Sequence, residues 1–181
     1  MDADALFSAL NETLPAIQIE RAPSIDPQTS AYVSRTDLPA VARVLRDRAG
    51  LAFTLLAELT AVDFWPREPR FEVVYLLVSV EHRLRLRLKV KLEGHDARVS
   101  TVSDIWPAAT WLEREVWDLF GIEFERHPDP RRLLMPEDWE GFPLRKDYPV
   151  QINTRVRTSE PLQLTEEEFR ANMQKDRLTR G

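Results

Sequence analysis

The strongest constraint on the fold is a stretch of strictly alternating residues, 83–92 (RLRLRLKVKL). A period of two places its basic side chains on one face of a β-strand and its apolar side chains on the other. Residues 71–80 are apolar on both faces, which is typical of a central strand, and residues 53–64 form another strand candidate. Shorter candidates are 17–19, 31–33 and 98–100. Strands that follow one another through tight connections favour an antiparallel sheet of about four strands.

Segments with helical periodicity lie on both sides of these strands. Residues 2–14 place their leucines on one face, and a second helix can be capped by Thr36 or Asp37. A third helix starts near Thr110 and ends at Gly121, a residue type that favours the left-handed conformation found after helices. Helices before and after a group of strands predict an α+β domain, with the helices packed on one face of the sheet.

The character of the chain changes after residue 149. Residues 1–149 carry the predicted domain, whereas residues 150–181 show no clear period and are expected to run as an extended tail. Thr165 and Glu168 have the spacing of a capping box, so we expect a short terminal helix within this tail. Such a helix has few apolar residues and needs a surface to dock on.

Composition excludes several classes of protein. The 181 residues carry a formal net charge of −5 and include no cysteine. A negative chain has no global field that attracts nucleic acid or anionic lipid. Without cysteine there is no thiolate-bound iron–sulfur cluster, no cysteine-bound zinc and no thiol nucleophile. No signal-peptide pattern and no apolar run of about 20 residues is present, so we expect another chain to provide any attachment to a membrane.

The basic face of residues 83–92 allows two interpretations. A row of cations could bind a phosphate backbone, but the stretch has no interleaved aromatic residues for base stacking, and the chain is acidic. The alternative is a half-exposed strand whose cations pair with acids on neighbouring strands or on an acidic partner. We favour the second interpretation.

Acidic residues cluster in the third predicted helix. Glu113 and Glu115 are two residues apart, so they point about 200° away from each other and cannot share a substrate. Glu115 and Asp118 are neighbours on the helix, and a stand-alone carboxylate enzyme that uses this pair is one hypothesis. Nearby arginines would keep both ionised and favour structural ion pairs such as Arg114–Asp118. Thr110 and Glu113 also have the spacing of a capping box.

Other catalytic or ligand-binding signatures are not found in the sequence. The three histidines are far apart, and His127, which precedes a proline, is expected to be a hydrogen-bonding residue of a turn rather than a base. Only five glycines are present, and they form no phosphate-binding or dinucleotide-binding loop. We therefore predict no catalytic residue, no metal site and no cofactor in this chain.

The segment from 127 to 149 combines prolines, aromatic residues and cations. Its prolines reduce the entropy cost of holding one extended shape, and aromatic residues with arginine are the usual composition of binding hot spots. The residues concerned are Arg131, Arg132, Arg145, Lys146, Trp139, Phe142 and Tyr148. Either the segment wraps its own sheet, with its arginines paired to the acids of the preceding helix, or it contacts a partner. Both can hold together.

The third helix and this segment together resemble a known family signature. The matching residues are Glu113-Arg114-Glu115, Asp118, Leu119-Phe120, His127, Arg131, Leu133, Leu134 and, further on, Gly141 and Pro143 to Pro149. This pattern is similar to that of the thirty-kilodalton subunit of NADH-quinone oxidoreductase, which is respiratory complex I. Residues 1–50 resemble the family only loosely. Phe142 stands where many members carry His, which argues against essential chemistry at this position.

The resemblance implies a place for the chain in a larger enzyme. It implies an α+β subunit in the hydrophilic arm of complex I, at the cytoplasmic face of the membrane, where electrons pass from NADH to quinone and protons are translocated. It further implies that FMN and the iron–sulfur clusters belong to other subunits and that the chief partner is the quinone-site subunit, which builds the quinone cavity. Related membrane-bound hydrogenase complexes have an equivalent subunit, and the signature separates the two poorly. The expected signature and partner-contact residues are Glu113, Arg114, Glu115, Asp118, His127, Arg131, Arg132, Arg145, Lys146, Asp147 and Tyr148.

Overall fold

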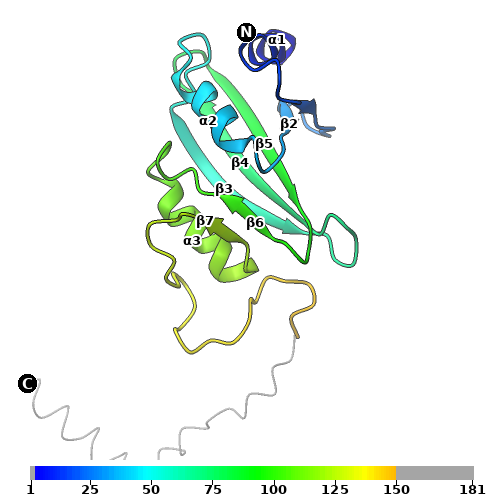
Figure 1. The fold of residues 1–181 in the computed structure, drawn as a ribbon, viewed down its shortest axis with the longest axis vertical. Coiled ribbons are helices and arrows are strands. Elements are labelled where there is room, and N and C mark those ends of the chain that lie inside the picture. The colour runs from blue at the N-terminus through cyan, green and yellow to red at the C-terminus, as the bar shows by residue number, and fades with distance from the viewer. Residues whose placement is uncertain (1–2, 150–181) are drawn as a thin grey trace, which may run out of the picture. The chain divides into compact units, whose positions relative to one another are not determined.

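The computed structural model describes residues 3–149. Their helices and strands run in the order α1, β1, β2, α2, β3, β4, β5, β6, α3, β7 (Figure 1). The predicted extended tail, residues 150–181, and its terminal helix lie outside the described residues, so both stay predictions.

Five strands form the main sheet. They are β1 (Glu20–Arg21), β2 (Ser30–Tyr32), β3 (Leu55–Asp63), β4 (Phe71–Ser79) and β5 (Leu84–Leu92). Their order across the sheet is β1-β2-β5-β4-β3, and the pairing of β2 with β5 is parallel while the other three are antiparallel. The sheet thus has five strands and one parallel pairing, where about four antiparallel strands were expected. The strand expected at 17–19 lies at Glu20–Arg21 instead. Segments of two or three residues carry too little periodicity to show where or with what they pair.

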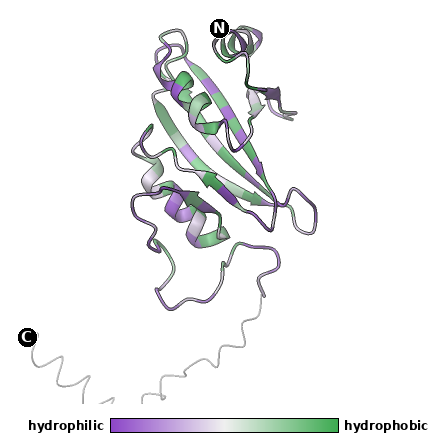
Figure 2. Ribbon diagram, in the orientation of Figure 1, coloured by the Kyte–Doolittle hydropathy of each residue, from purple (hydrophilic) through white to green (hydrophobic). Residues whose placement is uncertain are grey.

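The alternation along β5 gives the main sheet two different faces. On the inner face, Leu86 and Leu88 lie opposite Leu77 and Tyr75 of β4, and all four side chains are buried in one hydrophobic core. Figure 2 shows the alternation along β5 as bands of opposite hydropathy. The prediction for this strand is confirmed except at Arg83, which lies in the turn before β5 with a φ of 54°.

Cations of β5 lie on the opposite, outer face, and two of them pair with acids. Lys89 Nζ lies 2.8 Å from a carboxylate oxygen of Glu72 on β4, and Arg87 lies 2.9 Å from Asp26. Lys91 stacks over Tyr32 of β2, with its Nζ 3.9 Å from the ring centroid. The prediction of pairing with acids on neighbouring strands is confirmed for Lys89, whereas the partner of Arg87 lies in the loop between β1 and β2.

Within residues 3–149, three helices pack their buried side chains into the same hydrophobic core as the inner face of the main sheet. They are α1 (Ala3–Thr13), α2 (Leu38–Asp47) and α3 (Ala109–Phe120), and each has buried side chains in that core. The α+β class is therefore confirmed. Asp37 precedes α2 as predicted, but its carboxylate accepts a hydrogen bond from the Ser34 hydroxyl and does not cap the helix. No helix in the described part of the chain is long and apolar enough to span a bilayer.

Helix α3 connects the two strands of a second, smaller sheet. Strand β6 (Arg98–Ser100) pairs in parallel with β7 (Glu123–Glu125), and a helix is the usual crossover between parallel strands. Gly121 ends α3 in the left-handed conformation with a φ of 70°, as predicted. The sequence did not predict β7, because three residues give no usable period.

Candidate functional site

The candidate site consists of α3 and the segment that follows β7, residues 126–148, which we call the strap. The strap contains no helix or strand. It is held in place by hydrogen bonds and ion pairs from its side chains and amides to α3 and to the main sheet. These contacts decide which signature residues are available to a partner.

Asp118 of α3 is the central anchor of the strap. One of its carboxylate oxygens, Oδ2, accepts the amides of Leu133, Leu134 and Met135 at 3.0, 2.7 and 2.8 Å. The other, Oδ1, lies 2.6 Å from Nη1 of Arg132. Burial alone would raise the pKa of Asp118, but the hydrogen bonds from Met135, Arg132 and the other amides outweigh it and lower the pKa. The carboxylate is therefore ionised and fully engaged.

Arg132 connects Asp118 to the far part of the strap. Its Nη2 donates to the carbonyl of Trp139 at 2.8 Å. Its guanidinium also lies near two rings, 5.7 Å from the centroid of Trp117 and 5.8 Å from that of Phe142. A planar cation with aromatic neighbours and a carboxylate partner is held in one orientation.

Arg114 does not pair with Asp118, which corrects the prediction from their spacing. Its Nε and Nη2 donate to the carbonyls of Arg131 and Arg132, each at 3.0 Å, and its Nη1 lies 3.2 Å from Asp129. The strap thus supplies acceptors that a helix-only argument could not include. Arg114 and Asp118 both hold the strap, but through different strap residues.

Arg145 caps the C-terminal end of α3. It donates from Nε to the carbonyl of Phe120 and from Nη2 to the carbonyl of Gly121, the latter at 3.2 Å. These carbonyls have no partner within the helix, and the negative end of the helix dipole favours a cation there. Burial lowers the pKa of Arg145, and Arg70 adds to this effect, yet a guanidinium stays charged in proteins.

Asp63, at the end of β3, fastens the strap to the main sheet. Its carboxylate accepts the Lys146 amide at 2.9 Å and pairs with Arg70 at 2.9 Å, while Arg70 also binds Asp147 at 2.6 Å. Burial opposes ionisation of Asp63, but the hydrogen bonds from Arg70 and the backbone amides outweigh it and lower the pKa to about 2. Sequence reasoning missed Asp63 and Arg70 because their strap partners lie 83 and 77 residues away.

Glu113 is a buried acid whose hydrogen-bond donors precede α3 in the chain and do not belong to the strap. It is 0% exposed, and its carboxylate accepts the Val102 amide at 2.8 Å and the Thr101 hydroxyl at 2.5 Å. The predicted capping box with Thr110 is therefore wrong, and α3 begins at Ala109 without a side-chain cap. Burial raises the pKa of Glu113 to about 7, because it outweighs the opposing effect of these two hydrogen bonds.

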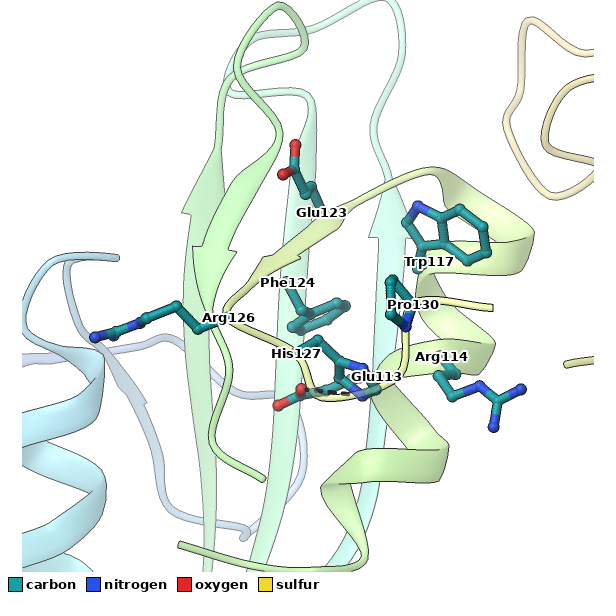
Figure 3. A pocket seen from close by; sticks show the side chains of 8 residues that line it. All are labelled: Glu113, Arg114, Trp117, Glu123, Phe124, Arg126, His127 and Pro130. Carbon is teal, nitrogen blue, oxygen red and sulfur yellow. Dashed lines mark ion pairs between the residues drawn. The ribbon is translucent and has the colours of Figure 1, made fainter. Parts of the chain in front are cut away.

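His127 lies beside Glu113 at a cavity of about 210 Å³ (Figure 3). Its Nε2 is 3.8 Å from Glu113 and 3.0 Å from the carbonyl of Thr110, while its Nδ1 accepts the Asp129 amide at 3.0 Å. With both ring nitrogens engaged, the ring cannot take a proton from a substrate without breaking the turn that it holds. This is the turn role that the sequence predicted for His127.

The remaining signature residues differ in exposure. Glu115, Arg131 and Lys146 are exposed, whereas Tyr148 is half-buried and donates its hydroxyl hydrogen to the Glu140 carbonyl at 3.2 Å. Glu115 makes no ion pair within residues 3–149, so it does not share a site with the engaged Asp118. Across the same described part of the chain, no cluster of three potential metal ligands is present.

Large apolar side chains are exposed on α3 and the strap. Trp111 is 59% exposed, Leu134 59% and Leu144 51%. The charged residues of the site are thus largely committed to internal contacts, while these apolar ones are open to solvent. The arrangement therefore presents exposed apolar side chains on a backbone that internal ion pairs and hydrogen bonds hold in place.

Comparison with known proteins points to one family. The family model described as "Respiratory-chain NADH dehydrogenase, 30 Kd subunit" matches residues 31–154. A relative from Roseiflexus sp., which is named as a subunit of NADH-quinone oxidoreductase, is 50% identical over 121 residues, which cover 67% of this chain and 70% of that protein. A relative of the same name from Geobacter sulfurreducens is 46% identical over 125 residues, covering 68% and 76%.

Two solved structures share the fold. A trypsin-resistant fragment of Nqo5 has 30% sequence identity and a TM-score of 0.56, covering 71% of this chain and 99% of the fragment. A chain of the membrane-bound sulfane sulfur reductase, an archaeal respiratory membrane complex, has 29% identity and a TM-score of 0.68, covering 81% and 85%. With the signature on α3 and the strap, these likenesses show that the chain belongs to the family of the 30 kDa subunit of respiratory-chain NADH dehydrogenase, the enzyme also called NADH-quinone oxidoreductase.

Proposed function

We propose that the chain is a structural subunit that supports assembly of NADH-quinone oxidoreductase and carries no redox group of its own. It sits in the hydrophilic arm at the cytoplasmic face of the membrane, next to the quinone-site subunit. Other subunits hold the FMN and the iron–sulfur clusters that pass electrons from NADH to quinone, and the complex couples this transfer to proton translocation. The chain contributes a rigid surface to which neighbouring subunits bind.

One observation supports this role above the others. Several charged groups of the signature are engaged in fixing the strap, as Asp118 shows with its three amide donors and one arginine partner. What the fixed strap and α3 present outward are large apolar side chains, led by Trp111 and Leu134. Aromatic and aliphatic anchors on a rigid scaffold bind a partner with little loss of conformational entropy.

The test removes the exposed apolar side chains of Trp111 and Leu134 and keeps the residues that fix the strap. Trp111→Ala combined with Leu134→Ala should lower the thermal unfolding temperature of the isolated chain only slightly. Both side chains are more than half exposed, and Trp111 loses the stacking of Arg114 over its ring at 5.2 Å. The same variant should enter the complex at least about tenfold less well, as expected for the loss of two interface anchors. Incorporation is measured by co-purification with a tagged neighbouring subunit.

Glu81→Ala is the matched control. Glu81 is exposed in the turn between β4 and β5, outside α3 and the strap, and makes no ion pair within the described residues, so its removal should not change incorporation. Wild-type incorporation of the Trp111/Leu134 variant would contradict the proposal.

A second candidate is the equivalent subunit of a related membrane-bound respiratory complex. The likeness to the sulfane sulfur reductase chain, with a TM-score of 0.68, favours keeping it. The two candidates differ in what co-purifies: a complex that oxidises NADH supports the first, and one that does not oxidise NADH supports the second. The stand-alone carboxylate enzyme is not favoured, because both oxygens of Asp118 are occupied by internal donors.

A further inference from the structure

The outer face of the main sheet is not covered by any helix within residues 3–149. The strand register places Leu55 and Val62 of β3 on this face, together with Val74, Leu76 and Val78 of β4. None of these side chains belongs to the main hydrophobic cluster, although Val74 is buried among its neighbours on the sheet at 8% exposure. Leu55 is 47% exposed and Val62 is 38% exposed.

This composition is unusual for a face that meets water. An antiparallel sheet with one solvated face normally alternates apolar and polar residues, as β5 does. Strand β4 does not, because its outward residues Val74, Leu76 and Val78 are as apolar as its inward ones. A contiguous apolar patch beside polar residues is typical of a protein-binding surface.

The outer face differs in charge from strand to strand. The apolar residues lie on β3 and β4, and the cations lie along β5. Lys89 and Arg87 are neutralised by Glu72 and Asp26. Arg85 and Lys91 are exposed and have no carboxylate partner within the described residues. Although the chain has a net charge of −5, the outer face therefore presents two cations on β5 that no carboxylate of the described residues neutralises.

We propose that the outer face is a second docking surface, separate from α3 and the strap. Its occupant is a segment of another subunit that places apolar side chains over β3 and β4 and carboxylates along β5. A second copy of this chain fits poorly, because the exposed acids of the face, Glu20 and Glu58, lie on the edge strands β1 and β3 and not opposite β5. The inference rests on the proposed function, since it takes the occupant to be a neighbouring subunit.

The chain has no cysteine, so one introduced thiol reports on one position. Leu55→Cys and Val78→Cys place a thiol on the outer face, and Asn11→Cys places one on the exposed side of α1 as a control. All three should react with a water-soluble maleimide in the isolated full-length chain. In the purified complex, the reaction rate of the two outer-face thiols should fall at least roughly tenfold, as at the desolvated centre of an interface. The reaction rate of the α1 thiol should not change.

Charge reversal provides an independent measurement. Arg85→Glu should lower incorporation into the complex because it repels the proposed carboxylates. Arg67→Glu, the same change at an exposed position in the β3–β4 connection, should not.

Two outcomes overturn the inference. Outer-face thiols that react equally in the complex and in the isolated chain would show that no partner covers the face. Thiols already protected in the isolated chain would show that its own residues or a second copy cover it. A complex that lacks the chain altogether contradicts the proposed function, whereas a complex that contains it with freely reactive outer-face thiols contradicts only this inference.

Discussion

Two acids on α3, Glu113 and Asp118, lie in opposite electrostatic environments. Asp118 has an arginine and three amides as donors, and its pKa is lowered despite burial. Glu113 has one amide and one hydroxyl as its donors, and its pKa is raised to about 7. Helical periodicity alone does not distinguish these two environments, because it shows neither the burial of a carboxylate nor the hydrogen-bond donors that come from other parts of the chain.

Glu113 should make stability depend on pH. Its pKa is about 7 in the folded chain and 4.5 ordinarily, so between these values the folded chain binds more protons than the unfolded chain. The free energy of unfolding should therefore fall as pH rises from 4.5 through 7, by about 3 kcal/mol at most. Glu113→Gln should remove this slope, measured by chemical denaturation at several pH values.

Glu115→Gln is the control for that measurement. The exposed Glu115 lies two residues away and should leave the slope of the wild type unchanged. An identical pH slope in wild type and Glu113→Gln would contradict the account of Glu113.

Gly121 is required by both conformation and space. Its φ is 70°, and a Cβ there would lie 2.4 Å from Phe142 and 2.5 Å from Arg145. Gly121→Ala should lower the free energy of unfolding by roughly 1–3 kcal/mol, because of left-handed strain and the displacement of these two side chains. Gly50→Ala, where a Cβ meets nothing within 4 Å, should change it little. Equal effects in thermal unfolding would argue against this role.

At the scale of elements, the sequence predicted what periodicity encodes. The strands from 53–64, 71–80 and 83–92 were found with nearly correct ends, and Gly121 was found as the end of α3. The capping box at Thr110 and the Arg114–Asp118 pair were wrong, because the true partners come from other elements. The partners of Glu113 lie 11 and 12 residues away, and those of Asp118 lie 14 to 17 residues away.

The strap should loosen when Asp118 loses its charge. In Asp118→Asn the amide oxygen can still accept the strap amides, but the amide nitrogen then faces Arg132 and the buried ion pair is lost. The free energy of unfolding should fall by roughly 3 kcal/mol. Limited trypsin digestion should also cut after Arg131 or Arg132 sooner than in the wild type.

Asp129→Asn is the strap control. Asp129 is more exposed than Asp118 and pairs with Arg131 and Arg114, so its loss should have a smaller effect on both measurements. A larger effect of Asp129→Asn than of Asp118→Asn would contradict the view that Asp118 is the central anchor.

At the scale of the whole molecule, the described residues offer two surfaces of different chemistry. One is α3 with the strap, a proline-stiffened surface with exposed Trp111 and Leu134. The other is the outer face of the main sheet, apolar on β3 and β4 and basic on β5. The sequence pointed to the first through its signature. It also predicted β4 as a central strand that is apolar on both faces, and the structure confirms its central place in the sheet. Apolar residues in the sequence do not show whether a partner covers the outer face.

We propose that this chain contributes a structural surface to the complex and no catalytic group. The most direct measurement is NADH:quinone reductase turnover per assembled complex, for complexes built with Glu113→Gln, Glu115→Gln or Trp111→Ala chains. Activity in membranes should fall only in proportion to assembly, so turnover per complex should stay at the wild-type value. A fully assembled complex containing Glu113→Gln or Glu115→Gln with turnover reduced about tenfold or more, the usual scale for loss of an acid–base group, would contradict it.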